Sequence, residues 1–413
     1  MSRRAHLLKN VGLVFWGCFF FSCGRPTATE TQPPFDPLTA EWAEITQKSR
    51  DQTVNFAMWM GDPYINDYMR NWVVPRVKEQ HGITLNLVPA QGGQIVSAIM
   101  TELEAGKKNS EYDMVWINGE TFYQLRQINA LFGPFTKQLP NAALIDFDNP
   151  FIGIDFQQPI DGYECPWGNV QLALIYNSER VTTPPQSRAD LLAWVEKNPG
   201  RFTFDSTFTG MTLLKSWMID IAGDPQILGG PFDEETYRQI STALWAYVRR
   251  LQPHLWRGGE SFPNSLAQMH QMFANGELDF TMSNNDGEVD NKVLQGLFPE
   301  TSRAYVPAYG TIQNSHYLGI IAGSPNKAAA MTVINFMISP AAQLEKQNPA
   351  VWGDGTVLDR AKLPATWSEK FASVPNRVHA PARETIQDRA HMELAPEYMI
   401  RLYEDFRREV LGE

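Results

Sequence analysis

The stretch that decides the fold runs Thr53-Val54-Asn55-Phe56-Ala57-Met58-Trp59-Met60 and continues as Gly61-Asp62-Pro63. Its first eight residues alternate in the manner of a strand. Asp62 is a good N-cap and Pro63 suits the first helical position, so a helix is predicted to begin there. Apolar side chains then recur at helical spacing, namely Ile65, Tyr68, Met69, Trp72, Val73 and Val77. The sequence therefore predicts a strand that leads directly into a helix.

The alternation of strand and helix continues after this stretch and occurs again in the second half of the chain. Strands are predicted at 83–88 and 112–117, separated by a helix at 94–106 and followed by a helix after Asn118-Gly119-Glu120. This alternation predicts a parallel sheet with helices on its faces. The alternation returns later, with strands at 172–176, 201–205 and 278–282 and helices at 187–198, 211–222, 237–251 and 266–274. We therefore predict an α/β fold with two such units and no internal sequence repeat.

Four loops of this predicted fold are suited to ligand binding. In open α/β sheets, ligands bind where strands end and helices begin. That rule selects residues 59–63 and 118–120 in the first unit, and 206–210 and 283–287 in the second. A site shared between two units is what a protein that closes around its ligand requires.

The N-terminus predicts an export signal that ends in a lipid anchor. Three basic residues precede an apolar run of 11 residues, 11–21, which is too short to span a bilayer as a helix. A small residue directly before Cys23 resembles a bacterial lipobox, so Cys23 is the predicted lipidated first residue of the mature chain. Cys18 is the competing position, and a plain secretory signal is a further reading. Residues 2–9 also look like a twin-arginine signal, so the export route stays open.

The mature chain is acidic. Removal of residues 1–22 takes away three basic residues and leaves 32 basic against 46 acidic side chains, a balance of −14. This charge argues against nucleic acid and anionic lipid as partners. Residues 26–37 are rich in proline and threonine and predict an extended tether. Beyond the signal and anchor, Cys165 stands alone, so neither an internal disulfide nor a cysteine metal site is predicted.

The chain resembles the extracellular solute-binding proteins of bacterial ABC transporters at two segments. The first is Leu174-Ile175-Tyr176-Asn177-Ser178-Glu179, followed by Pro184-Pro185 and a helix. The second is Ser324-Pro325-Asn326-Lys327 with the helix after it and then Ser339-Pro340-Ala341-Ala342-Gln343, where Ala342 replaces the acidic residue common in the family. Further runs resemble its YnjB-type subgroup: 58–63, 116–120, 132–135, 166–168, 198–203, 255–257 and 352–354.

The resemblance implies a type II periplasmic-binding-protein fold, with two α/β lobes and a ligand cleft between them. It implies a signal peptide at 1–22, a tether and lead-in at 23–49, one lobe at 50–163 plus 314–355, and the other at 164–313 plus 356–413. The joining segments around 163–167 and 310–314 are expected to form the hinge at the cleft floor.

The candidate ligand-binding residues come from the four loops, the two expected crossovers and the return segment. They are Trp59, Gly61, Asp62, Asn118, Glu120, Tyr163, Trp167, Thr209, Gly210, Asn284, Asp286, His316 and Trp352, with Asp354 beside the last. Tryptophan and tyrosine rings stack on sugars or cations, and the helix that begins at Thr209-Gly210 offers free N–H groups.

Each candidate also has a purely structural reading, and both readings stay open. The tryptophans and His316 can be core residues, and Asp62 can serve only as a helix cap. Glu120 can merely favour the helix dipole, and the residues around Asp286 can form an Asx turn.

Aromatic rings with carboxylates and amides suit an organic cation, thiamine-like or polyamine-like, or a sugar. The loops contain too few basic groups for phosphate or sulfate, and no metal or cofactor is predicted. The resemblance implies an ABC permease with its ATPase subunits as partners, and a monomer. A sensory binding lipoprotein would look the same in sequence. A secreted α/β enzyme is a weaker alternative, because no Gly-x-Ser-x-Gly, His-Glu-x-x-His or phosphate-binding loop occurs.

Overall fold

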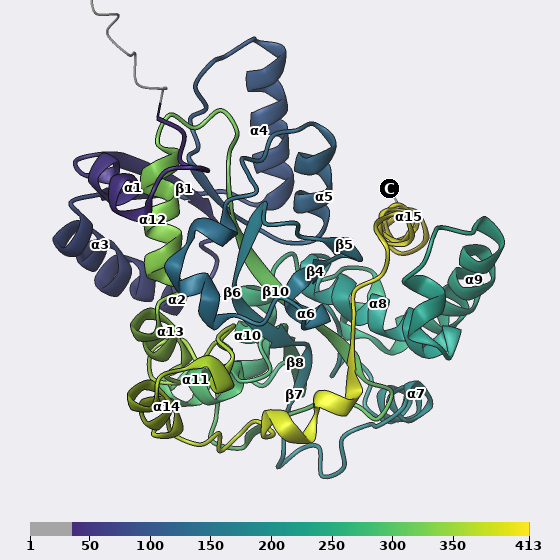
Figure 1. Cartoon of the computed structure of the whole chain (residues 1–413). Coiled ribbons are helices and arrows are strands. Elements are labelled where there is room, and N and C mark those ends of the chain that lie inside the picture. Colours follow the sequence, from purple (N-terminus) through teal and green to yellow (C-terminus); the bar gives the residue numbers. More distant parts are fainter. Residues whose placement is uncertain (1–34, 413) are drawn as a thin grey trace, which may run out of the picture. The chain divides into compact units, whose positions relative to one another are not determined.

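The computed structural model describes residues 35–412 and contains two β-sheets and a separate hairpin (Figure 1). The first sheet has the strand order β11-β10-β3-β1-β2, with β6 also paired to β10; the second has the order β8-β7-β9; the hairpin is β4-β5. The strands are β1 Thr53–Met58, β2 Thr84–Pro89, β3 Met114–Ile117, β4 Ile154–Asp155, β5 Gln158–Pro159, β6 Glu164–Gln171, β7 Ala173–Asn177, β8 Phe280–Ser283, β9 Ser302–Tyr305, β10 Thr311–Ile320 and β11 Ala390–His391.

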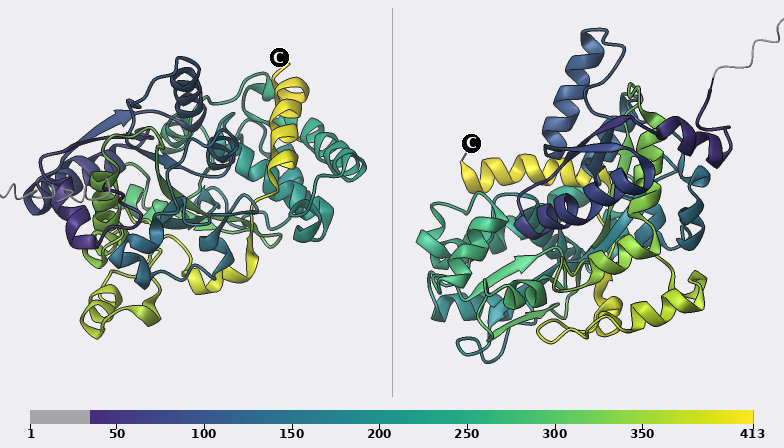
Figure 2. Two further views of the ribbon diagram at one scale, coloured as in Figure 1. Left: turned by 45° about the horizontal axis from the view of Figure 1, so that its top comes forward. Right: turned by 90° about the vertical axis from the view of Figure 1, so that its left-hand side faces the viewer.

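Helices surround these sheets in all three views (Figures 1 and 2). The α-helices are α1 Trp42–Ser49, α2 Pro63–Asp67, α3 Val74–His81, α4 Gly92–Glu104, α5 Glu120–Gln127, α6 Pro150–Gly153, α7 Arg188–Lys197, α8 Phe208–Ala222, α9 Glu234–Leu251, α10 Leu266–Ala274, α11 Glu288–Leu294, α12 Lys327–Met337, α13 Pro340–Gln347, α14 Ala365–Ala372 and α15 Pro396–Phe406. No helix among the described residues is both long and apolar enough to cross a membrane.

The first sheet confirms the pattern read from residues 53–117. β1 lies parallel to β2, with Val54 opposite Leu85, and parallel to β3, with Phe56 opposite Met114. The helix after β1 begins at Pro63, and Asp62 caps it by accepting from the Tyr64 N–H at 2.8 Å. Helices α4 and α5 bury their apolar side chains against β1 and β3 in one core cluster.

The second sheet differs from the prediction. β7 pairs antiparallel with both β8 and β9, so the parallel pattern expected for the second unit is wrong. The expected strand at 201–205 is also wrong. Its side chains are largely buried, but its backbone makes isolated bonds, such as Trp256 N–H to Phe202 O at 2.9 Å, instead of a ladder. A short apolar run predicts burial and leaves the strand partner undefined.

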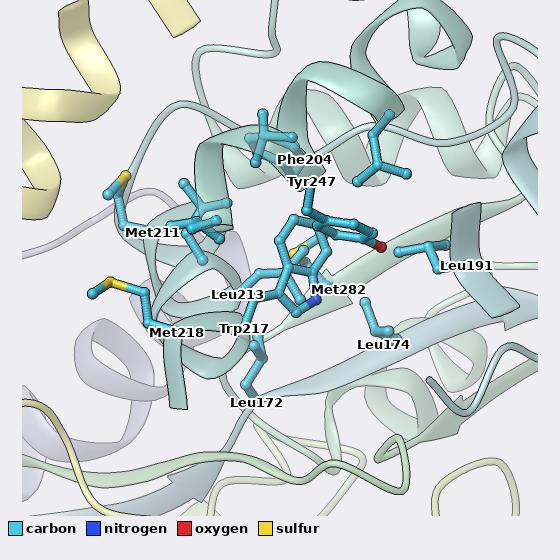
Figure 3. Packing of buried hydrophobic residues seen from close by; sticks show 14 of the residues in the cluster. Leu172, Leu174, Leu191, Phe204, Met211, Leu213, Trp217, Met218, Tyr247 and Met282 are labelled. Atoms are coloured by element: carbon cyan, nitrogen blue, oxygen red, sulfur yellow. The ribbon is translucent and has the colours of Figure 1, made fainter. Parts of the chain in front are cut away.

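The second sheet has its own hydrophobic core (Figure 3). Trp217 of α8 lies at its centre and packs edge-on against Tyr247 of α9 with ring centroids 5.2 Å apart. The sheet contributes Leu174 of β7 and Met282 of β8 to the same cluster. Tyr398 and Phe406 of α15 join the same cluster, so the C-terminal helix packs with the second sheet.

Two long strands connect the sheets. β6 and β10 run antiparallel side by side, with Gln171 opposite Gln313 and Glu164 opposite Gly319. Residues 164–167 therefore lie inside the first sheet, and the chain leaves it at Leu172, just before β7. The two expected joining segments, 163–167 and 310–314, thus fall at the starts of β6 and β10, and their role as a hinge stays a prediction. The lobe boundaries themselves stay a prediction. Cys18, Cys23 and the signal peptide lie outside the described residues, as does most of the tether.

Candidate ligand-binding site

The structure brings the four predicted loops together between the two sheets. Asp62, in the first loop, forms an ion pair with Lys292 of α11, the helix that follows the fourth loop. Asn284 of the fourth loop donates to Thr209 Oγ1 at 3.0 Å, which joins the third and fourth loops. The second loop packs on Phe156, whose ring lies 4.8 Å from the ammonium of Lys215 in α8. Loops far apart in the sequence thus meet at one interface.

Asp62 is fully engaged at this interface. One carboxylate oxygen caps α2 and the other pairs with Lys292, which also lies 3.0 Å from Glu288 and 4.8 Å from the Tyr64 ring. Burial lowers the pKa of Lys292, but the attraction of Glu288 and Asp62 outweighs it, so the pKa is raised and the lysine stays charged. The N-cap prediction for Asp62 is confirmed, and its ligand role stays a prediction.

The hairpin β4-β5 places an aromatic ring between the sheets at a cost in backbone strain. Phe156 and Gln157 form its two-residue turn with φ of 46° and 59°. Both values lie in the left-handed region, where turns of this kind favour Asn-Gly and a bulky aromatic is rare. Gln157 Nε2 donates to Glu393 O at 2.6 Å. A Cβ at Gly119 would lie 1.8 Å from the Phe156 ring, so only glycine fits beneath it. Strain of this kind concentrates at ligand clamps.

Lys215 lies at the centre of the interface. Its side chain is 0% exposed, and its ammonium lies 2.6 Å from Glu393 Oε2 and 5.2 Å from the Phe208 ring, opposite Phe156. Asn314 holds the other oxygen of Glu393 at 3.0 Å. Two aromatic rings and a carboxylate around a buried ammonium form a cage for a cation. We call Lys215, Glu393, Phe156 and Phe208 the lysine cage.

Three buried carboxyl groups, Asp155, Glu164 and Asp205, have raised pKa values. Burial raises the pKa of Asp155 well above its ordinary value, although the Gly119 N–H donates to it. Burial, and then the charge of Asp155, raise the pKa of Glu164, and neither of its carboxyl oxygens has a hydrogen-bond partner. Burial likewise raises the pKa of Asp205. The charge of Lys215 offsets this effect in part for Asp155, and the charge of Arg126 does so for Glu164.

The N-terminus of α8 is already occupied by a carboxylate. Asp205 Oδ1 accepts from the Thr207 N–H at 2.8 Å, and the Gly210 N–H also acts on this carboxylate. A Cβ at Gly210 would lie 1.8 Å from Asp205 O, so the backbone approach requires glycine. The free N–H groups expected at Thr209-Gly210 are therefore in part used by the protein itself.

Four of the predicted residues form one aromatic cluster around a fifth, Trp116, which was not among the candidates. Trp116 of β3 packs against Trp59, Trp167, His316 and Trp352, with ring centroids 5.1–6.4 Å apart. Trp167 is fully buried, and its Nε1 has no hydrogen-bond partner. His316 Nε2 lies 3.0 Å from Asp354 Oδ2, which also pairs with the buried Lys346. These contacts give the cluster a packing role, whereas its contact with a ligand stays a prediction.

Two further candidate residues, Tyr163 and Asp286, already have arginine partners within the protein. Tyr163 lies beneath the guanidinium of Arg126, 3.6 Å from its ring centre. Asp286 is buried between Arg377 and Arg383; burial raises its pKa, but the two guanidinium groups prevail and hold it well below the ordinary value. Asp286 also accepts from the Gln171 N–H at 3.0 Å, so it ties the fourth loop to β6.

The sequence contained a signal for Lys215 that we did not use. It is the one charged residue within the apolar run 211–219, and buried lysines are rare unless paired. Nothing near Glu393 or in 154–159 marked those residues, since their partners lie far away in the chain. Among the described residues, no group of His, Cys, Asp and Glu has a metal-binding arrangement.

The space beside the lysine cage is small. A crevice lined by Asp155, Phe156, Asn314 and Glu393 has a volume of about 10 Å³, room for at most one water molecule. A larger crevice of about 510 Å³ lies between α9 and α15, away from the four loops. A solute can enter beside the cage only if side chains there move.

Comparison with known proteins identifies the family. The family model of bacterial extracellular solute-binding proteins matches residues 72–375. The chain belongs to this family. It is 37% identical to Protein YnjB of Escherichia coli (strain K12) over 338 residues, which are 81% of this chain and 87% of that protein. The predicted family and its YnjB-type subgroup are confirmed, and the family consists of binding proteins.

Solved structures confirm the type II periplasmic-binding-protein fold. An ABC transporter structure from Clostridium perfringens matches with a TM-score of 0.59 at 16% identity, covering 87% of this chain and 99% of that one. The binding protein AfuA from Actinobacillus pleuropneumoniae, with fructose-6-phosphate bound, matches with a TM-score of 0.60 at 14% identity, covering 88% and 99%. PotD from Streptococcus pneumoniae, a spermidine/putrescine binding protein, matches with a TM-score of 0.59 at 16% identity, covering 87% and 99%.

Proposed function

We propose that this solute-binding protein captures an organic cation between its two lobes and delivers it to an ABC importer. The observation that carries the cationic ligand is the lysine cage itself, in which two aromatic rings and the Glu393 carboxylate hold an ammonium. Burial is the largest cause of the raised pKa values of Asp155, Glu164 and Asp205, and the positive charges of Lys215 and Arg126 offset it only in part for the first two. A solute with an ammonium or similar group would supply further positive charge.

The proposed site uses residues from both sheets. The first sheet contributes the loop Asn118–Glu120, the separate hairpin β4-β5 contributes Phe156, and the second sheet contributes α8 with Lys215. Glu120, Glu393 and Asp205 each raise the pKa of Tyr403 in α15, after the larger effect of burial, so all three act on this tyrosine. In this proposal the other predicted residues, including Trp59, Trp167 and Asn284, either hold the site residues in place or lie along the path by which the solute enters.

The ligand class is favoured by the chemistry of the cage, and the structural neighbours include proteins named for cations of this kind. PotD and a putative transporter from Listeria monocytogenes are named for spermidine and putrescine. Other neighbours are named with fructose-6-phosphate or iron, so the shared fold does not select a ligand. The N-terminus of α8 favours neither phosphate nor sulfate, because Asp205 holds its N–H groups.

The transport role implies partners and a location. In this proposal the chain is exported, anchored through Cys23, acts as a monomer without catalysis, and docks on a permease with its ATPase subunits. A sensory role would use the same binding site. Cross-linking in the native membrane should recover a permease; recovery of a receptor kinase or chemoreceptor in its place would contradict the transport role.

A thermal-shift screen tests the ligand class. Putrescine, spermidine, choline and thiamine would be compared with glucose, amino acids and phosphate on the purified protein. We expect a saturable rise in melting temperature with a cation, since binding at 100 times Kd adds about 2.7 kcal/mol to stability. A rise produced only by sugars or anions would refute the cationic ligand.

A further inference from the structure

The lysine cage resembles a binding site that already holds a cation. Phe156 and Lys215 come from different parts of the fold, with Phe156 on the strained hairpin tip and Lys215 on α8. The ammonium lies 4.8 Å and 5.2 Å from the two ring centres and 2.6 Å from Glu393. Aromatic faces together with a carboxylate are the means by which proteins recognise organic ammonium ions.

A second lysine at the same interface provides a contrast. Lys292 also bridges the sheets through a carboxylate and an aromatic ring. Its carboxylates have other donors, because Asp62 caps α2 and Glu288 accepts from the Ser283 hydroxyl. Lys215, by contrast, forms a single ion pair among the described residues, with Glu393, while Asp155 lies within electrostatic range of it. Lys292 is thus held by two ion pairs, whereas Lys215 is held by one.

We propose that Lys215 competes with the cationic group of the solute for the lysine cage and so sets the affinity for the solute. This inference rests on the proposed cationic ligand and adds the residue that governs its binding. The crevice beside the cage is too small for an organic ion, so the ammonium of Lys215 must turn away before a solute can reach Glu393.

The surroundings of Lys215 allow that movement without leaving a buried charge unpaired. The lysine stem is flexible, and its ammonium can change partners. Asp155 is within electrostatic range of Lys215 and lies on the same hairpin as Phe156. Lys215 would pair with Asp155 while the cation of the solute takes Glu393 and the two rings. Each of the two cations would then have a carboxylate partner, Asp155 for Lys215 and Glu393 for the solute.

Removal of the internal competitor should strengthen cation binding. The test compares wild-type protein, Lys215→Met and the matched control Lys292→Met, with methylammonium and choline as probes and acetate as the anionic comparison. For Lys215→Met we expect a saturable rise in melting temperature with methylammonium and a Kd for choline about tenfold lower than wild type, as removal of a competing state requires. Lys292→Met should show neither effect, and acetate should stabilise none of the three proteins.

Lys215→Met leaves the carboxylate of Glu393 without its partner and could therefore destabilise the fold. A second variant separates that effect from the effect on cation binding. Lys215→Met combined with Glu393→Gln removes both charges and should lose the gain in choline affinity. The proposal is overturned if Lys215→Met binds the probes no more tightly than wild type, if Lys292→Met gains equally, or if wild type binds acetate through Lys215. A wild-type protein that binds no organic cation in the screen refutes the proposed function instead.

Discussion

Arg383 donates to Asp286 at 2.7 Å and to the backbone oxygen of Asn169 at the same distance, so one guanidinium joins the C-terminal segment, the fourth loop and β6. Arg377 approaches the same carboxylate from another side. The Asp286 side chain is fully buried, and the two arginines keep it ionised. This carboxylate therefore stabilises the region where the chain passes from one sheet to the other.

Replacement of Asp286 should strongly destabilise the protein. Asp286→Asn leaves two arginines facing a neutral amide, and loss of one partner from a buried ion pair costs about 3–5 kcal/mol. Urea unfolding would measure this loss. Asp388→Asn is the control, because Asp388 is 79% exposed and lies 3.7 Å from Arg389, so its removal should cost less than about 1 kcal/mol.

Asp286 should also contribute to acid unfolding. Its pKa in the folded protein is lowered, so its contribution to stability is fully present above the ordinary aspartate pKa of about 3.9 and is lost as the pH falls through the lower folded value. Unfolding of wild type and Asp286→Asn across acidic pH should show the two stabilities converging. Curves that stay parallel would mean that the carboxylate is not held ionised by its arginines.

The pair Asp155 and Glu164 should give the opposite pH dependence. The folded protein keeps their protons at pH values where the unfolded chain has lost them, so their effect is to lower stability as the pH rises above about 4. Glu164→Gln should reduce that slope, whereas Glu300→Gln, at a side chain 87% exposed, should not. Binding of a cation should also release protons, which calorimetry in buffers of different ionisation enthalpy would detect.

Trp167 should matter more for stability than Trp59. Trp167 is fully buried and contacts Trp116, His316 and Trp352, so Trp167→Ala should cost about 3–5 kcal/mol in unfolding free energy. Trp59 is partly exposed and meets the cluster at Trp116, so Trp59→Ala should cost clearly less. Equal losses would contradict the packing role of Trp167.

The lipid anchor is tested at the two cysteines of the N-terminal segment. Cys23→Ala should abolish incorporation of labelled palmitate in the bacterial host, while Cys18→Ala should leave it intact. Labelling that survives Cys23→Ala but not Cys18→Ala would place the anchor at Cys18. Labelling that survives both would remove the anchor from the proposal.

The sequence predicted those features that depend on neighbouring residues. The cap at Asp62, the helix after it and the parallel strands through Ile117 follow from local spacing and turn chemistry. The pairing of β7 could not be predicted in this way, because Leu174 lies opposite Met282 and Tyr305, more than 100 residues away. The same distinction applies to the candidate site. The four loops are predicted from the positions of strand ends, and their ligand role stays a prediction. The ion pair of Lys215 with Glu393 is formed only in the folded chain.

The carboxylate of Asp205 at the N-terminus of α8 has a consequence for selectivity in a crowded medium. Inorganic anions are abundant in most surroundings, and exposed helix N-termini attract them. Here the N–H groups of Thr207 and Gly210 are already directed at a side chain of the protein. Phosphate and sulfate would meet a fixed negative group in place of free donors. We therefore expect this helix N-terminus to discriminate against inorganic anions before any solute-specific contact is made.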